Sequence, residues 1–393
     1  MNREISCVCD MKIHEREKRR WNMSMNPRTP WKGTMTQRER FNALMHYKTF
    51  DRTVNMEFGY WKENYEQWDI FTENNIKNEK QANDFFAFEP PVCVSGSIEM
   101  DPPFEPKIIE DRGRTVVRVS RDGLWEEVPK EGSSIPKYLR SSIETPEDWE
   151  ELKKRSFDRF SESRKPNFEV LDDVCREDRD YPVGVNCGSM IGRIRDILTV
   201  EGLSYAVMDY PEMVEDMVET HCDLVCDYLD AVLPHYHFDF AYGWEDICCK
   251  NGPLVNMDFF RSVIYPCYKR IGNKLHKYGV DIWYTDCDGD VRPLLPYFLD
   301  AGINCLFPYE VNGCSHPSEL LEQYGKDLRI MGGFNKMAMI EGKDAIKAYM
   351  KSLEPLVARG GYIPFCDHRC PPDVTPENYL YYLDLKEKTF GIS

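Results

Sequence analysis

The sequence lacks a long apolar run. No stretch of its 393 residues approaches the roughly 18 uninterrupted apolar residues that a membrane span needs. The N-terminal segment MNREISCVCDMKIHEREKRRW also lacks the apolar centre of a signal peptide. We therefore expect a cytoplasmic protein with no membrane partner.

Basic charge is scarce. Lys and Arg number 50 against 67 Asp and Glu, which gives a net charge of −17 and a pI near 5.1. Such a surface repels nucleic acid phosphates, so we expect no nucleic acid partner. The one basic cluster, Lys12 to Arg20, lies in residues 1–34, which we interpret as a polar N-terminal extension.

Zinc-ribbon cysteine spacing is absent as well. The 15 cysteines are scattered through apolar segments, and the close pairs Cys7/Cys9 and Cys248/Cys249 do not have the spacing of a structural zinc site. In a chain without a secretory signal, this pattern indicates reduced thiols.

The patterned part of the chain begins near Met35. Thr36 is placed to cap a helix whose apolar side chains fall on one face, and the strand-like run TVNMEFGYW follows Arg52. The segments TVVRVS and GLWEEVP predict a small antiparallel ribbon. A helix capped by Thr145, with Pro146 in its first turn, ends this part.

From residue 180 onward, short apolar runs alternate with amphipathic helices, which predicts parallel strands joined by crossovers. No G-x-G-x-x-G turn follows an early strand, so a dinucleotide-binding sheet is disfavoured. We predict an α/β protein whose residues 35–393 form a (β/α)8 TIM barrel with a small β-ribbon elaboration. The predicted strands are YPVGVNCG, FDFAYGWEDI, VDIWYTDCDGD, INCLFPYEV, LRIMGGFN and GYIPFCDH.

In a barrel, the residues that close the strands meet at one mouth. Several carboxylates converge there in this prediction, and they repel one another unless a cation or a proton compensates them. One histidine among carboxylates suits a divalent metal such as zinc. The strand-closing residues are Asn186, Cys187, Trp244, Glu245, Asp246, Asp286, Cys287, Asp288, Asp290, Tyr309, Glu310, Asn335, Asp367, His368 and Arg369.

Each candidate also has a structural interpretation. The D-C-D-G-D stretch can be a turn that caps a helix, and the adjacent acids Glu245 and Asp246 can be caps or ion-paired groups. Glu310 lies in a stretch with turn character, and His368 can be a satisfied structural histidine. Cys366 and Cys370 flank His368, but strand alternation makes a three-ligand cluster from this loop alone unfavourable.

Several motifs together resemble the uroporphyrinogen decarboxylase superfamily from about Met35 to the end. They are M-T-Q-R-E-R-F-N-A-L followed by D-R, W-E-D, D-x-D-G, P-Y-E, G-G-F-N and the closing H-x-x-P-P-D-x-x-P-E-N. The resemblance implies a (β/α)8 barrel, with homodimers common in the superfamily. In true decarboxylases a histidine matches His368, and an R-Q-A-G-R loop holds the substrate's carboxylates. No arginine pair follows Arg52 here.

The chain is more similar to the branch of zinc-dependent methyltransferases that act with corrinoid proteins. Several of these have an H-x-C-G motif and a cysteine three residues before a proline pair. Alignment on Gly289 and on the proline pair at 371–372 places Asp286, Asp288 and His368 at the matching ligand positions. These oxygen and nitrogen ligands stand where the methyltransferases have thiolates. A metal bound by them would be a harder Lewis acid, which suits coordination of an ether oxygen.

The resulting hypothesis is a zinc-dependent methyltransferase, the O-demethylase component that moves a methyl group from a small methoxylated or methylated substrate to a corrinoid protein. The alternatives are decarboxylation of a tetrapyrrole and a non-catalytic barrel that binds a corrinoid or tetrapyrrole. The predicted catalytic residues are Asp288, His368 and Glu310, and the predicted metal ligands are Asp286, Asp288, Glu310 and His368. The predicted substrate-binding residues are Tyr60, Asn186, Trp244, Glu245, Asp246, Tyr284 and Tyr309, although the aromatic ones can equally be rim packing.

Overall fold

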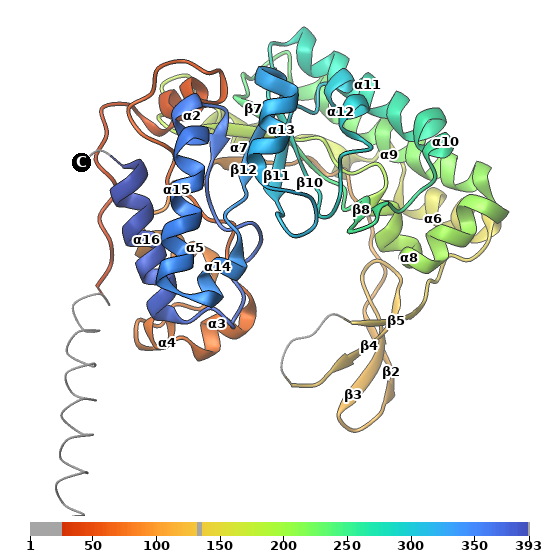
Figure 1. The fold of residues 1–393 in the computed structure, drawn as a ribbon. Helices are drawn as coiled ribbons and strands as arrows, with labels where there is room; N and C mark the ends of the chain where they lie inside the picture. Colours follow the sequence, from red (N-terminus) through yellow and green to blue (C-terminus); the bar gives the residue numbers. More distant parts are fainter. Residues whose placement is uncertain (1–25, 132–135, 392–393) are drawn as a thin grey trace, which may run out of the picture.

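A seven-stranded parallel sheet forms the centre of the computed structural model, which describes residues 26–131 and 136–391 (Figure 1). The strand order is β1-β6-β7-β10-β11-β12-β13, and every neighbouring pair is parallel. The six apolar runs predicted after residue 180 are thus confirmed as strands of one sheet. The strands are β1 Val92–Val94, β6 Val183–Asn186, β7 Phe240–Trp244, β10 Trp283–Asp286, β11 Cys305–Tyr309, β12 Arg329–Gly332 and β13 Tyr362–Ile363.

Helices connect successive strands, as the alternating pattern predicted (Figure 1). Proline stands in the first turn of several of them, where its missing N–H leaves no hydrogen bond unmade. The connecting and C-terminal helices are α8 Gly192–Asp209, α9 Pro211–Val232, α10 Met257–Phe259, α11 Tyr265–Lys277, α12 Leu295–Ala301, α13 Pro317–Tyr324, α14 Lys336–Glu341, α15 Lys343–Arg359 and α16 Pro376–Phe390, with a π-helical turn at Phe260–Ile264 and the short strands β8 Cys248–Cys249 and β9 Gly252–Pro253.

The N-terminal helices lie on the side of α15 and α16, with α2 at the upper end in Figure 1 and α3 and α4 at the lower end. The first begins as predicted, because Thr36 and Glu39 make a reciprocal capping box. Arg28 and Trp31, which the sequence assigns to the extension, already pack on the body: Arg28 pairs with Asp384 at 2.6 Å and Trp31 is buried. The basic cluster Lys12 to Arg20 lies outside the described residues. The helices are α2 Gln37–Met45, α3 Lys62–Gln67, α4 Asp69–Glu73 and α5 Glu79–Phe86.

An extended segment, residues 53–60, contacts both ends of the strand order. Asn55 accepts a backbone hydrogen bond from Glu89, just before β1, and Gly59 accepts one from Cys370, which follows β13. Val54 and Met56 point to the inner apolar cluster of the sheet, together with Phe240, Ile282 and Phe365. The segment therefore continues the inner surface that the named strands form.

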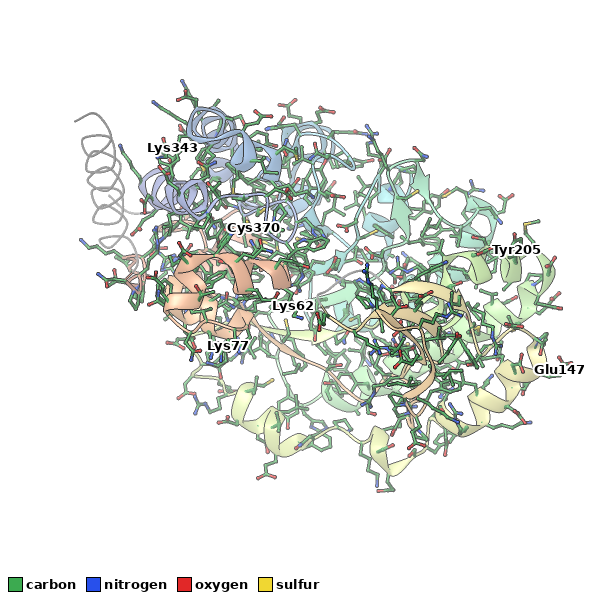
Figure 2. All side chains as sticks on the ribbon, turned by 90° about the horizontal axis from the view of Figure 1, so that it is seen from below. Lys62, Lys77, Glu147, Tyr205, Lys343 and Cys370 are labelled. Carbon is green, nitrogen blue, oxygen red and sulfur yellow. The ribbon has the colours of Figure 1, made fainter. Side chains whose placement is uncertain are left out.

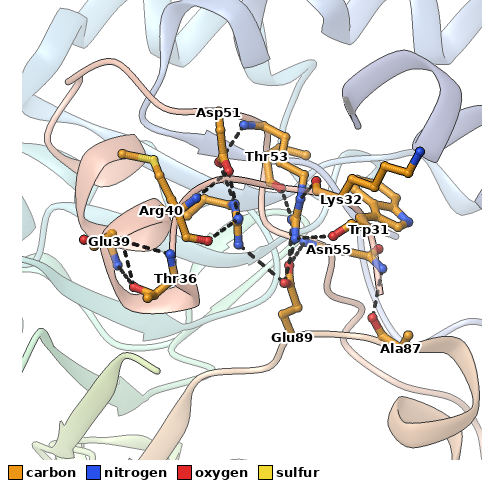
Figure 3. A network of polar contacts seen from close by, with 12 residues as sticks. Trp31, Lys32, Thr36, Glu39, Arg40, Asp51, Thr53, Asn55, Ala87 and Glu89 are labelled. Atoms are coloured by element: carbon orange, nitrogen blue, oxygen red, sulfur yellow. Dashed lines mark hydrogen bonds and ion pairs between the residues drawn. The ribbon is translucent and has the colours of Figure 1, made fainter. Parts of the chain in front are cut away.

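A buried ion-pair network fixes the start of this segment (Figure 3). Arg52 donates both terminal nitrogens to Glu89 at 2.7 Å, and Arg40 binds Asp51 at 2.8 Å. Both guanidinium groups are only 2% exposed. Burial alone would raise the pKa of Asp51, but Arg40 and two backbone N–H groups hold that pKa below its usual value. Each charge in this network has a direct partner.

A second sheet, antiparallel and four-stranded, projects from the lower side of the body in Figure 1. It contains the predicted ribbon segments as β3 and β4 and is joined to α8 by a 2.7 Å hydrogen bond from the Ser141 hydroxyl to the Ile197 carbonyl. Within residues 26–131 and 136–391, no helix combines the length and apolar character that crossing a membrane requires. The strands are β2 Lys107–Asp111, β3 Thr115–Val119, β4 Trp125–Pro129 and β5 Lys137–Arg140, and helices α6 Pro146–Ser156 and α7 Phe168–Val174 follow.

Candidate functional site

Two predicted site residues meet at the carboxyl ends of the parallel strands, an edge that we call the mouth. Asp288 follows β10 and His368 follows β13, with β11 and β12 between them in the strand order. Nevertheless, His368 Nε2 lies 3.3 Å from Asp288 Oδ2. The other carboxylate oxygen, Asp288 Oδ1, is buried and has no hydrogen-bond partner among the described residues. The pair therefore retains an unused acceptor.

Asp286 lies at the same mouth. It continues the inward-facing positions Ile282 and Tyr284 of its strand, and no side chain of the described residues pairs with it. Burial raises its pKa well above the usual value, and the neighbouring acids Asp246 and Asp288 raise it further. Arg369 lowers this pKa only in part, and among the described residues Asp286 makes no ion pair like those in the network of Figure 3.

Asp246 is connected to the same pair through its side chain. Its Oδ1 accepts a 3.3 Å hydrogen bond from the Asp288 backbone N–H, and its Oδ2 accepts one from Arg195 at 3.1 Å. The Arg195 guanidinium also lies 5.1 Å from the centre of the Trp244 ring. Arg195, which the sequence reasoning did not single out, thus holds two predicted residues in place.

Glu310 has a different partner from the one predicted. Lys336, the first residue of α14, binds its carboxylate at 2.8 Å. The fully buried Asp367 accepts backbone hydrogen bonds from Val311 and Lys336, and burial raises its pKa to about 6. Asn335 caps α14. Glu310 belongs to this group, and no direct contact joins it to Asp288 or His368 in the described structure.

Glu245 and Asn186 organise the start of α8. The buried Glu245 carboxylate accepts hydrogen bonds from the backbone N–H groups of Met190, Ile191 and Gly192 and from the Ser189 hydroxyl. Asn186 bonds Ser95 and the Gly188 N–H. Glu245 therefore acts as a helix cap in this structure, the structural interpretation that the sequence had left open.

Three predicted tyrosines are buried, and none of them forms a hydrogen bond or ring contact with Asp288 or His368 among the described residues. Tyr60 is buried among the N-terminal helices, where its hydroxyl lies 2.6 Å from that of Tyr379. Tyr309 is buried against the outer helices and reaches Ser315. Tyr284 does face inward, but it is buried between Phe240 and Phe307 below the mouth.

Irregular backbone explains two of these placements. Gly59, with φ of 115°, interrupts the alternation between inward Phe58 and outward Tyr60. A register shift between Leu306 and Tyr309 does the same in β11, where Phe307 faces inward. Alternation counted through uninterrupted strands would have placed all four side chains on the inner face.

Aromatic residues that the sequence reasoning missed lie beside the pair. The Phe58 ring meets the edges of His368 and Phe307 at centroid distances of 5.6 and 5.1 Å. Tyr242 stacks on Tyr284 at 5.9 Å. Phe58, Phe307 and Tyr242 are each partly exposed. Strand alternation could have found two of them, because Phe58 and Tyr242 lie two residues after Met56 and Phe240, whose side chains face inward.

Backbone packs on backbone behind Asp288. A Cβ added to Gly289, whose φ is 81°, would lie 2.7 Å from the carbonyl of Cys249. A Cβ added to Gly313 would lie 2.9 Å from the Gly289 Cα. Three loops therefore approach one another more closely than side chains would permit.

The predicted zinc site is matched only in part. The imidazole and carboxylate groups of His368 and Asp288, with the orphan Asp288 Oδ1, have the donor chemistry of a divalent metal site. Within the described part of the chain, however, no group of three or more His, Cys, Asp or Glu residues is arranged to hold an ion. Cys366 and Cys370 are buried in the outer core. We derive no reaction step through a metal.

Four cationic side chains described near the mouth each form an ion pair. Arg195 pairs with Asp246, Lys336 with Glu310, Arg292 with Asp290, and Arg369 with Glu79. Figure 2 views the molecule from the side of α3, with Lys62 and Cys370 labelled. An anionic substrate would have to displace one of these carboxylates to gain a cation.

A cavity of about 340 Å³ lies at the ends of β6 and β7, and β7 is the neighbour of β10 in the sheet. Trp244 on its wall is the register partner of Asp286 on the neighbouring strand. Two predicted substrate-binding residues, Asn186 and Trp244, therefore line a space next to the uncompensated acids.

Comparison with known proteins identifies a family. Residues 126–388 match the uroporphyrinogen decarboxylase (URO-D) family. A solved methyltransferase from Methanosarcina mazei is similar in fold, with a TM-score of 0.54 at 14% sequence identity over 90% of this chain and 99% of that one. No curated protein matches the sequence.

Proposed function

Since the chain belongs to the uroporphyrinogen decarboxylase family, we propose that it is a methyltransferase that moves a methyl group from a small methylated or methoxylated compound to a corrinoid protein. The observation that carries this proposal is the Asp288–His368 pair at the mouth, 3.3 Å apart and close to the uncompensated Asp286. The similarity in fold to a methyltransferase supports it. We further propose that the segment 53–60 closes the sheet into a (β/α)8 barrel.

The positions of the arginines favour methyl transfer over tetrapyrrole decarboxylation. A porphyrinogen substrate presents several carboxylates, and these need free cations. Arg52, beside the first extended segment, is buried on Glu89, and each arginine or lysine described above at the mouth is already paired. A polyanion would therefore meet repulsion rather than a receptive surface.

The chain's own residues would hold the substrate and exclude water. The partly exposed rings of Phe58 and Phe307 give the mouth an apolar floor, and Phe58 orients His368 through its ring edge. His368 Nε2 and Asp288 Oδ2 lie 3.3 Å apart, so a ring nitrogen and a carboxylate oxygen lie together at the mouth, where the substrate would bind. The corrinoid would supply the nucleophile, Co(I), and the residues of this chain would supply position and charge.

A zinc ion is part of the proposal: Asp288 and His368 would hold it, and the predicted ligand Asp286 would have to move to supply a third donor. When bound, such an ion would supply Lewis acidity to a donor whose leaving atom carries a free lone pair, such as an ether oxygen. Glu310, which pairs with Lys336, is the least suited of the four predicted ligands.

The proposal is tested by measuring bound metal and methyl transfer to a reduced corrinoid protein. We expect transfer from at least one small methyl donor, loss of transfer in the His368→Ala variant, and no carbon dioxide release from uroporphyrinogen. Equal transfer by metal-free and metal-loaded protein would exclude the metal role. Decarboxylation without methyl transfer would exclude the function.

A further inference from the structure

The cavity at the ends of β6 and β7 is lined by more acidic than basic side chains. Its walls include the rings of Tyr242 and Trp244, the amide of Asn186, and the charged side chains of Glu99, Arg193 and Asp196. At about 340 Å³, its volume is near the lower end of the range for ligand pockets. It therefore suits a small molecule.

Arg193, the one cation on these walls, already makes three ion pairs, although its buried Nε has no hydrogen-bond partner among the described residues. It binds Glu99 at 2.6 Å, Asp122 at 2.7 Å and Asp196 at 3.5 Å. Three carboxylates thus surround one guanidinium, so the local formal charge is negative. An anionic ligand would compete with these three acids for a single arginine, whereas a cation would gain from their excess charge.

The aromatic wall already attracts a cation. The Arg195 guanidinium lies over Trp244 at 5.1 Å from the ring centre, within the range of a cation–π contact. Tyr242 stands on the same strand two residues before Trp244, so both rings belong to one face of β7. Rings with nearby carboxylates are the chemistry by which proteins recognise quaternary ammonium groups.

We propose that this cavity binds a small organic cation of the quaternary ammonium class and that this cation is the methyl donor. The second half of the proposal rests on the proposed function. In the transfer, the carbon–nitrogen bond breaks and its electron pair stays on nitrogen, while the Co(I) electron pair forms the cobalt–carbon bond. The products are a neutral tertiary amine and methyl-Co(III), with no proton taken up or released.

Choline and 3,3-dimethylbutan-1-ol make a matched pair of probes, because they share a shape and differ in the charged nitrogen. Titration calorimetry at pH 8 and constant ionic strength keeps Asp196, whose pKa burial raises to about 6, ionised. We expect choline to bind at least about tenfold more tightly than the alcohol, the range of a partly desolvated cation–π contact with carboxylates nearby. Equal affinity, or no choline binding, would overturn the inference.

Variants assign the binding to this cavity. Trp244→Leu and Glu99→Gln should each weaken choline binding by about three- to tenfold, in keeping with the loss of one ring or one charge. Glu201→Gln is the control, since Glu201 is an exposed acid on α8 that lines a different pocket. Melting temperatures monitor folding of each variant. Unchanged choline affinity in both cavity variants would contradict the assignment.

Methyl transfer separates the two proposals. Transfer to the corrinoid from a neutral or anionic methyl ether, with none from a bound quaternary ammonium compound, overturns the donor inference and leaves the proposed function intact. Selective choline binding without transfer from any donor supports cation recognition and overturns the proposed function.

Discussion

The buried network around Arg40 and Arg52 and the mouth around Asp286 and Asp288 are both rich in charge, but they treat it oppositely. In the network, every carboxylate has an arginine partner within 3 Å. At the mouth, Asp286 has no partner among the described side chains, and one Asp288 oxygen is left without a hydrogen bond.

This difference separates a structural from a functional use of charge. Paired ions fix the first extended segment in place and gain nothing from a ligand. Acids without ion-pair partners at a mouth repel one another, so a cation, a proton or a positively charged substrate that binds there lowers their free energy. Mutations in the two regions test this difference.

The largest effect is expected for Arg52→Ala. This change leaves the buried Glu89 carboxylate without its bidentate partner, which should lower the free energy of unfolding by about 3–5 kcal/mol. Urea denaturation measures the loss. Arg52→Lys keeps the charge but loses the bidentate geometry of the guanidinium group, so its unfolding free energy should lie between those of the wild type and the alanine variant. A loss below about 1 kcal/mol for the alanine variant would mean that the network contributes no more to stability than a surface ion pair.

Next comes His368→Ala at the mouth. The histidine is 26% exposed, so its removal should change the unfolding free energy by less than about 1 kcal/mol, yet it should slow methyl transfer at least about 100-fold. His235→Ala, at an exposed histidine after α9, is the control and should affect neither. A large stability loss with unaltered transfer would reverse the distinction drawn between the two regions.

His221 shows a third treatment, in which charge is avoided. This buried imidazole accepts from the Ser189 N–H, and burial lowers its pKa from 6.5 to about 3. The unfolded chain then binds the proton more readily, so stability is complete above pH 6.5 and falls as the pH decreases toward 3.

Between pH 6.5 and 5 this single group should cost about 2 kcal/mol of unfolding free energy. The His221→Asn variant should lack that part of the pH dependence, whatever its stability at pH 7.5. Denaturation curves for both proteins across this interval give the difference. Parallel pH profiles would show that His221 does not remain neutral.

The smallest effect is expected at the surface. Lys80 and Asp84 form an i,i+4 pair on α5 with side chains 83% and 68% exposed. Lys80→Ala should change stability by less than about 0.5 kcal/mol. A larger effect in thermal unfolding would mean that partner count alone, without burial, sets the value of an ion pair in this chain.

The sequence predicted the fold better than the site. Apolar runs and helix caps are local signals, so the six strands after residue 180, two of the four ribbon strands (β3 and β4) and the caps at Thr36 and Thr145 were found. The Asp288–His368 contact was predicted because both residues follow strands whose ends share one edge.

The failures come from contacts between distant segments. No local pattern could show that Lys336 would pair with Glu310 or that Glu245 would cap α8 from a neighbouring strand. Tyr60 and Tyr309 were named because they are aromatic and lie near strand ends, a criterion that gives no information on the face, and Gly59 and the β11 register shift turn both rings outward. Glycine inside a strand was the one available warning.

The glycine contacts behind Asp288 also constrain how this protein can change over time. Because Gly289 touches the backbone near Cys249 and Gly313 touches Gly289, a side chain at either glycine requires simultaneous movement of neighbouring loops. Single substitutions at Gly289 or Gly313 are therefore expected to be disfavoured. New substrate preferences would arise through the opposite wall, where Asn186, Glu99 and Asp196 project from separate elements and can be replaced one at a time.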